Sequence, residues 1–467
     1  MSEIRRIIEL YKNKEKLPSD IVVEFFERAK KNEFNSFISF NENVLEEAKK
    51  LDKKVKEGKI EGRLFGIPVS IKDNILVKGL KCTCASKVLE NYIAPYDATV
   101  IEKLKEEGAL IIGKTNMDEF AMGSSNEYSA FGSASNPFDR ERVPGGSSGG
   151  SAISVSAGEA PLSLGSDTGG SIRLPASFCG VYGLKPTYGA VSRYGLIAFA
   201  SSLDQIGPFA RCIEDVEILF DIIKGKDERD KTSTNYPEEE IKPSYPLKIG
   251  VLKDSFSDKV EEEIKTSLEE FIRLLEKEKI AQFKEFNMET FDYAIAVYYI
   301  VACAEASSNL ARYDGVLYGF ICKDNNLWDM YEKTRTEGFG EEVKRRIILG
   351  TFVLKSGYYE EYYVKAQKAR TKILKEFLKN FEEFHLLLMP VSPVLPFKKG
   401  EKLKDPISMY LSDIFTVSVN LAGLPAITFP FKLSKKGLPI GFQFVSKFFM
   451  EKLFFKVLKK IEKTIHG

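Results

Sequence analysis

Apolar residues recur at helical spacing along the first 60 residues of the chain. Ile4, Ile7, Ile8 and Tyr11 share one face of a first helix. A start signal at Pro18-Ser19-Asp20 precedes a second helix, whose apolar face holds Val22, Phe25, Phe26 and Ala29. The pattern predicts an N-terminal helical segment over residues 1–60 that packs on a larger body. A surface for a partner protein is the alternative use of these faces.

Short apolar runs that are typical of buried strands lie at 68–71, 110–112, 247–252, 386–389, 426–430 and 440–445. Helical patterns fill residues 287–382. Asp258, with Glu261 three residues later, forms a capping-box signal. The helix that it would start has an apolar face made of Val260, Ile264, Leu268, Phe271 and Leu275. Strands that alternate with helices predict an α/β fold.

Two stretches depart from this alternation. Residues 121–205 are dense in Gly and Ser, yet apolar residues recur inside them, so we expect buried strands and one helix joined by tight turns rather than a flexible linker. Residues 227–246 are polar and contain three prolines, which predicts a loop or an insertion boundary.

Composition narrows the class of protein. The chain has 467 residues, is 43% hydrophobic and has a net charge of +1, so no overall field attracts nucleic acid or an anionic membrane. The N-terminus lacks the apolar core of a signal peptide, and no run of 18 apolar residues occurs. The six cysteines include no CxxC pair, which favours free thiols in a reducing cytoplasm. Cys82 and Cys84 have no histidine nearby and make a poor zinc site, so no metal is expected.

Three segments carry candidate chemistry. Lys72 lies in Val69–Asn74, Ser147 in the run Pro144–Ser151, and Ser171 in the run Gly165–Arg173. Each alone has a plainer interpretation: a surface lysine, an anion-binding loop without the GxxxxGK[ST] order, or a hairpin turn. Together they indicate a serine nucleophile whose base is a lysine. The chain has only two histidines, His385 and His466, and both are distant in sequence.

The chain resembles the amidase signature family from about residue 10 to the C-terminus. Beyond the glycine–serine segments, the resemblance is to the branch that forms the A subunits of glutamyl-tRNA(Gln)/aspartyl-tRNA(Asn) amidotransferases. It rests on residues 117–127 (MDEFAMGSSNE), 185–189 (KPTYG), 201–208 (SSLDQIGP) and 420–425 (NLAGLP). The resemblance implies a single amidase domain over 1–467, with a central mixed β-sheet flanked by helices on both faces.

The resemblance also implies a Ser-Ser-Lys triad, with Ser171 as nucleophile, Ser147 as bridging serine and Lys72 as base, and a cis peptide bond between Gly146 and Ser147. A lysine accepts a proton only when neutral, and its free pKa is about 10.4. Burial must therefore lower the pKa by about three units, which costs roughly 4 kcal/mol. Backbone N–H groups of Ser171 and of the residues before it suit an oxyanion hole: Thr168, Gly169 and Gly170.

Glutamine is the substrate that the resemblance implies, with Arg346 at its α-carboxylate, Asp413 at its α-ammonium group and Tyr298 as a further contact. Arg370 is the rival carboxylate ligand. A solvated helix face is the alternative interpretation of Arg346, since Lys344 and Arg345 adjoin it.

The implied function is a glutaminase that hydrolyses glutamine and passes ammonia to a companion subunit. That companion uses ATP and Mg²⁺ to activate Glu-tRNA(Gln) or Asp-tRNA(Asn) and makes most tRNA contacts, and a small third subunit wraps the interface. This chain itself needs no cofactor. The alternatives are a free-standing amidase acting on small amides, a catalytically silent scaffold subunit and, more distantly, a nucleotide-binding protein.

Overall fold

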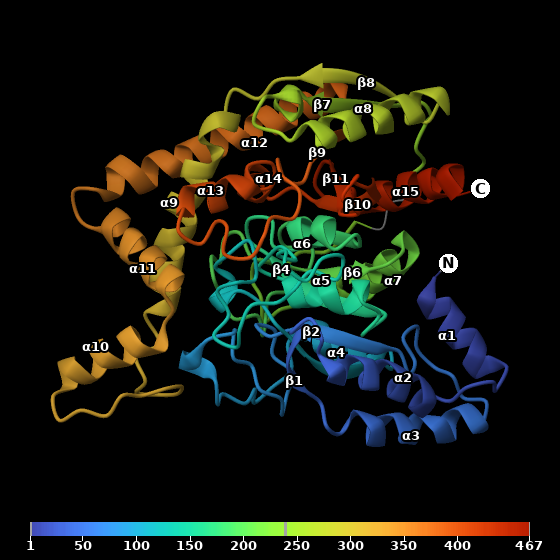
Figure 1. The fold of residues 1–467 in the computed structure, drawn as a ribbon, viewed down its shortest axis with the longest axis horizontal. Helices are drawn as coiled ribbons and strands as arrows, with labels where there is room; N and C mark the ends of the chain where they lie inside the picture. The colour runs from blue at the N-terminus through green and yellow to red at the C-terminus, as the bar shows by residue number, and fades with distance from the viewer. Residues whose placement is uncertain (1, 238–240, 467) are drawn as a thin grey trace.

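A single mixed sheet organises the chain (Figure 1). The computed structural model describes residues 2–237 and 241–466. The 11 strands lie in the order β1-β3-β2-β4-β6-β5-β10-β11-β9-β7-β8. Their bounds are β1 Phe37–Phe40, β2 Pro68–Lys72, β3 Leu110–Thr115, β4 Leu162–Asp167, β5 Tyr182–Lys185, β6 Gln205–Ala210, β7 Leu247–Leu252, β8 Ala281–Phe286, β9 Leu386–Pro390, β10 Ala426–Leu433 and β11 Pro439–Val445.

Interior and edge strands differ in burial. Every residue of β2, β3, β4 and β11 is buried, whereas the edge strand β8 buries only its two ends and one further residue in part. A strand buried along its whole length needs cover on both faces of the sheet. Strand β2 pairs in parallel with β3 and β4, and β4 pairs antiparallel with β6. The predicted α/β fold with a mixed sheet flanked by helices is therefore confirmed.

The helices that provide this cover are α1 Glu3–Lys12, α2 Pro18–Lys31, α3 Val44–Lys56, α4 Thr99–Glu106, α5 Gly149–Ser156, α6 Arg173–Phe178, α7 Ile213–Ile223, α8 Glu262–Lys277, α9 Phe291–Leu310, α10 Leu327–Gly338, α11 Glu341–Leu354, α12 Lys365–Glu383, α13 Pro406–Tyr410, α14 Val417–Ala422 and α15 Glu451–His466. Short 3₁₀ turns are η1 Lys87–Leu89, η2 Glu119–Ala121, η3 Lys253–Phe256 and η5 Leu411–Asp413, and η4 Tyr359–Val364 is a π-helical turn. Helix α10 projects from the body at the lower left of Figure 1.

Three local predictions need correction. Residues 1–60 are not wholly helical, because β1 pairs antiparallel with β3 at the sheet edge. The glycine-rich stretch contains two helices, α5 and α6, rather than one. Asp258 does not cap α8, which begins at Glu262. Glu261 instead accepts a hydrogen bond from the amide of Leu395, so it anchors a distant segment and is not available for a capping box.

The predicted loop at 227–246 contains no helix or strand among its described residues, and residues 238–240 lie outside them. It joins α7 to β7, and so connects two parts of one sheet. Tyr236 is buried against Phe220, so this loop is packed on the body. The single domain over 1–467 stays a prediction, which the continuous sheet supports.

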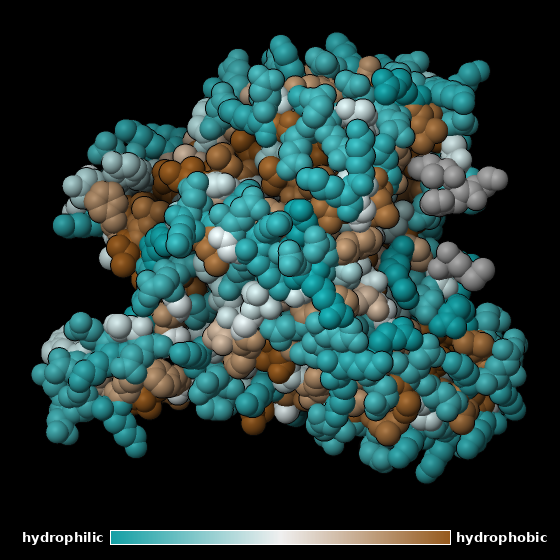
Figure 2. Space-filling view, viewed as in Figure 1, coloured by the Kyte–Doolittle hydropathy of each residue, from teal (hydrophilic) through white to brown (hydrophobic). Residues whose placement is uncertain are grey.

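The visible surface is mainly hydrophilic (Figure 2). Apolar residues gather at the left of this view, where α11 and α12 lie in Figure 1. Among the described residues, no helix combines the length and apolar character that crossing a membrane requires.

Candidate active site

Lys72 lies at the end of the central strand β2 and is fully buried. Its Nζ is 2.7 Å from Ser147 Oγ and 2.9 Å from Ser166 Oγ. Strand β2 lies between β3 and β4, and Ser166 belongs to β4. The parallel register of β2 and β4 therefore places the amine beside the serine-rich segments.

The electrostatic setting makes this amine easy to deprotonate. Burial lowers the pKa of Lys72 to about 7, and the carboxylates of Asp118, Asp167 and Asp204 act in the opposite direction. The nearest groups are hydroxyls rather than a carboxylate. The direction and size of the shift agree with what a lysine base requires near neutral pH.

Ser147 follows a backbone that only glycine permits. The Gly146–Ser147 peptide bond is cis, as predicted. A Cβ on Gly146 would lie 2.0 Å from Asp118 Oδ2, so no larger residue fits there. Asp118 is buried and accepts the amides of Asn126 and Tyr128 at 2.9 and 3.1 Å. This carboxylate thereby organises the chain around the bridging serine.

Ser171 lies between β4 and α6, in a loop held by Asp167. The carboxylate of Asp167 accepts the amides of Gly170 and Ile172 at 2.9 and 3.1 Å. It also pairs with the fully buried Arg173, with Nε 3.1 Å from Oδ2. The carbonyl of Ser171 accepts the amide of Ser148 at 3.1 Å. The structure thus brings the backbones of the two serine segments together, and Lys72 is hydrogen-bonded to Ser147 in one of them.

The proposed oxyanion loop is tightly packed. A Cβ on Gly169 would lie 2.5 Å from the ring and hydroxyl of Tyr298. Thr168 Oγ1 donates to Asp204 at 2.7 Å, and the Gly169 carbonyl accepts from Thr416 Oγ1 at 2.6 Å. The prediction for Gly170 is corrected, because its amide already donates to Asp167 and shapes the loop. Thr168 and Gly169 stay predictions as oxyanion donors.

Arg346 is buried, so the interpretation as a solvated helix face is wrong. It lies on the inner face of α11, where its Nε donates to Glu342 Oε1 at 2.8 Å. Its guanidinium carbon lies 5.1 Å from the ring centroid of Tyr299 and 5.5 Å from that of Tyr410. An aromatic cage and one carboxylate hold this cation in place.

Asp413 and Tyr298 share the electrostatic environment of Arg346. Burial raises the pKa of Asp413 to about 7, while a hydrogen bond from Ser124 and the charge of Arg346 act to lower it. Burial also raises the pKa of Tyr298, which Arg346 lowers and Asp413 raises further. The structure therefore brings together the three residues predicted for glutamine, beside Gly169.

Arg370 is engaged elsewhere. Its Nε donates to the Leu421 carbonyl at 2.8 Å, Nη1 donates to Ser202 Oγ at 2.7 Å, and Nη2 donates to the Ser202 carbonyl at 2.9 Å. All three nitrogens thus bind the chain itself. Arg346 therefore stays the predicted carboxylate ligand.

The sequence does not point to several residues of the site. Asp118 and Asp167 stand inside the conspicuous motifs, but their position beside the serines follows only from the fold. Ser166 is another partner of Lys72, and Ser124 binds Asp413. Glu342 had a usable signal, since it precedes Arg346 by four residues on one helix, the spacing at which side chains meet.

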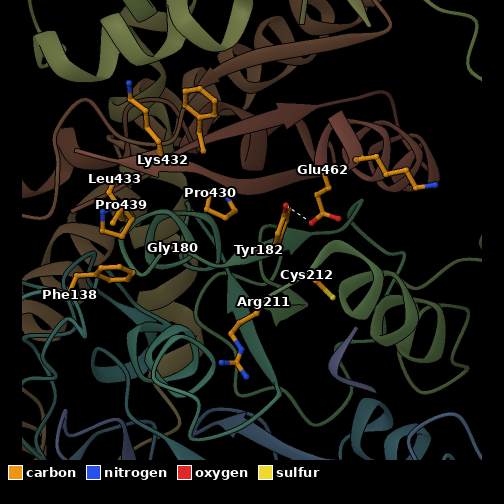
Figure 3. A pocket seen from close by; sticks show the side chains of 12 residues that line it. Phe138, Gly180, Tyr182, Arg211, Cys212, Pro430, Lys432, Leu433, Pro439 and Glu462 are labelled. Atoms are coloured by element: carbon orange, nitrogen blue, oxygen red, sulfur yellow. Dashed lines mark hydrogen bonds between the residues drawn. The ribbon is translucent and has the colours of Figure 1, made fainter. Parts of the chain in front are cut away.

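A cavity of about 680 Å³ lies apart from this site (Figure 3). Its lining comes from β5, the start of α7, the β10–β11 hairpin and α15, and it includes the Tyr182–Glu462 hydrogen bond of 2.7 Å. None of the residues predicted for catalysis or glutamine is among the described residues that line it. This cavity therefore does not mark the position of the predicted chemistry.

The family model for amidases matches residues 20–455. The chain belongs to the amidase family. It is 53% identical to the A subunit of a glutamyl-tRNA(Gln) amidotransferase of Persephonella marina, over 98% of this chain and 96% of that one. It is also 53% identical to an A subunit, numbered 2, of the Clostridium acetobutylicum amidotransferase, over 95% of each chain. The crystal structure of the Thermotoga maritima A subunit superposes with a TM-score of 0.78 and 44% identity, covering 96% of this amidase and 91% of that chain.

Proposed function

We propose that this chain is the glutaminase subunit of a tRNA-dependent amidotransferase. The observation that carries the proposal is the buried Lys72 amine, 2.7 Å from Ser147 and with its pKa lowered to about 7. The relatives named above share about half of its residues over nearly the whole length. They carry the name of that subunit, which supports glutamine as substrate.

The proposed reaction is acyl transfer through Ser171. As Ser171 Oγ attacks the side-chain carbonyl carbon of glutamine, its proton passes to Ser147, and the proton of Ser147 passes to Lys72 Nζ. Collapse of the tetrahedral intermediate breaks the C–N bond, and the proton returns through Ser147 to the leaving nitrogen, which departs as ammonia. Water then attacks the ester, releasing glutamate and restoring Ser171. Thr168 and Gly169 stabilise the oxyanion.

Substrate selection follows from charges that match an amino acid. Arg346 holds the α-carboxylate through its planar fork, and ionised Asp413 holds the α-ammonium group. Tyr298 closes the pocket against Gly169. A simple amide lacks both charges and gains nothing from either residue.

The ammonia then passes to a companion subunit, which uses ATP and Mg²⁺ to activate the glutamyl or aspartyl ester of its tRNA. A small third subunit covers the interface between the two, and the complex works in the cytoplasm. The surface supports an assembly, because α11, η4 and the residues between them expose apolar and aromatic side chains: Ile348, Leu349, Phe352, Tyr358, Tyr359 and Tyr362. Large exposed apolar patches mark protein interfaces. The formal charge of +1 fits a subunit that leaves most RNA contacts to a partner.

Turnover of glutamine and of simple amides by the purified chain and its complex tests this function. We expect ammonia release from glutamine, and little from amides without an amino-acid head group. Rapid turnover of simple amides with no preference for glutamine would favour a free-standing amidase. No covalent label on Ser171 from a fluorophosphonate would favour a silent scaffold.

A further inference from the structure

Glu342 is a buried carboxylate that the proposed reaction does not use. It lies in the first turn of α11, four residues before Arg346, and is 2% exposed. We propose that Glu342 is a positioning residue that aims the Arg346 guanidinium at the α-carboxylate of the substrate. This inference rests on the proposed function and adds to it a determinant of specificity.

The geometry divides the guanidinium into an anchored and a free side. Glu342 Oε1 accepts from Arg346 Nε at 2.8 Å and from the Tyr410 hydroxyl at 2.9 Å. Within the part of the chain that the structure describes, Nη1 and Nη2 of Arg346 have no hydrogen-bond partner. These two nitrogens form the fork that binds a carboxylate in bidentate fashion.

The local charge favours an anionic ligand. Glu342 Oε2 also accepts from Arg345 Nη1, so two guanidinium groups share one carboxylate. The trio keeps one unit of positive charge. A one-to-one ion pair would have left no net charge for the substrate, whereas this arrangement fixes Arg346 and preserves its attraction for a carboxylate.

Glu342 also connects the two ends of the proposed clamp. Tyr410, which donates to it, ends α13, and η5 with Asp413 follows directly. The ring of Tyr410 stacks on Tyr299 at 3.9 Å between centroids, and both rings face Arg346. One carboxylate thereby holds the helix of Arg346 against the segment of Asp413.

The test compares Glu342→Gln with Glu341→Gln in the full chain, purified in the complex in which it is active. Glu341 is the neighbouring residue, its side chain is 84% exposed and it pairs with Lys344 at the surface, so its variant is the matched control. We expect Glu342→Gln to raise the KM for glutamine about tenfold or more, with kcat changed by no more than about twofold. Inhibition by L-glutamate should weaken in parallel, and hydrolysis of an amide without an α-carboxylate should not change.

Tyr410→Phe provides a second variant, because it removes one hydrogen bond to Glu342 and keeps the ring. It should raise KM in the same direction by a smaller factor, which keeps the proposal testable even if Glu342→Gln folds poorly. The proposal is overturned if Arg346→Ala raises KM while Glu342→Gln and Tyr410→Phe leave it unchanged. A lower melting temperature with loss of kcat alone would likewise assign Glu342 a purely structural role. If the wild-type complex hydrolyses no glutamine, the proposed function fails instead.

Discussion

Two buried lysines on neighbouring strands show how single contacts decide chemistry. Lys114 of β3 and Lys72 of β2 are both fully buried. Burial acts to lower the pKa of each, but Cys82 and Asp73, whose carboxylate lies 3.0 Å away, hold the pKa of Lys114 above its usual value. Lys72 faces serine hydroxyls, and burial brings its pKa to about 7. Of these two strands, β3 thus carries a structural cation and β2 the candidate base.

The first prediction concerns pH. Neutral Lys72 becomes abundant only above pH 7, and Asp413, whose pKa is raised to about 7, must lose its proton to bind an ammonium group. We therefore expect kcat/KM for glutamine to rise steeply between pH 6 and pH 8 and then level off. Steady-state kinetics at constant ionic strength measures this profile. A flat profile down to pH 5.5 would contradict the role of Lys72.

The same pKa predicts a stability change in Lys72→Met. Below pH 7 the folded state must bury a charge that the unfolded chain keeps in water, and this cost fades as the pH rises toward 10.5, the unperturbed value. Relative to the wild type, the variant should therefore gain more stability at pH 6 than at pH 9, on the order of 3 kcal/mol. Denaturant unfolding at both pH values measures this difference. The variant also loses hydrogen bonds to serine, but that loss is the same at both pH values and so cancels when the two effects are subtracted. An equal effect at both values would mean that the amine is charged in the fold.

At the scale of elements, two arginines on consecutive helices have different proposed roles: one binds the substrate and the other stabilises the fold. Arg370 of α12 binds carbonyl and hydroxyl oxygens of the chain, whereas Arg346 of α11 donates through Nε to Glu342 and is the proposed ligand of the substrate carboxylate. Arg370→Ala should lower the free energy of unfolding by about 1–3 kcal/mol and leave the KM for glutamine unchanged. Arg346→Ala should raise that KM at least tenfold.

Kinetics and thermal unfolding of the two variants side by side check both statements. A raised KM for Arg370→Ala with a normal value for Arg346→Ala would exchange the roles. Lys365→Ala, at the start of α12, serves as the control for a charge removed from the same helix.

Helices and strands could be predicted where the local sequence pattern matches the burial of the element in the fold. The strands at 68–71 (PVSI) and 247–252 (LKIGVL) could be predicted because apolar residues dominate both, as expected of strands inside a sheet that is covered on both faces. The strand β1 was missed because it is four residues long and lies at an edge. The Asp258 signal misled because Glu261 bonds to Leu395, a partner that no local pattern reveals. Likewise, the amide of Gly170 donates a hydrogen bond to Asp167 in a turn that depends on the final fold, so the sequence could not show that this amide is engaged.

At the scale of the molecule, the proposed function requires companions. Under that proposal, this chain supplies ammonia and the ATP-dependent step belongs to another subunit. We predict that affinity purification from the native source recovers two further proteins, one of which activates the tRNA ester with ATP. Recovery of the chain alone, with full activity on simple amides, would contradict this assignment. Substitution of exposed Ile348 and Phe352 by Ser provides a probe of the exposed apolar surface of α11 within that complex.

The proposed mechanism depends on a neutral amine that activates Ser171, and covalent labelling measures this most directly. The wild-type chain, Ser171→Ala and Lys72→Met are treated with a fluorophosphonate at pH 8, and the adducts are located and timed by mass spectrometry. We predict one adduct, on Ser171, absent in Ser171→Ala and formed at least about a hundredfold more slowly in Lys72→Met. Equal labelling rates in the wild type and Lys72→Met, or an adduct on another serine, would contradict the mechanism.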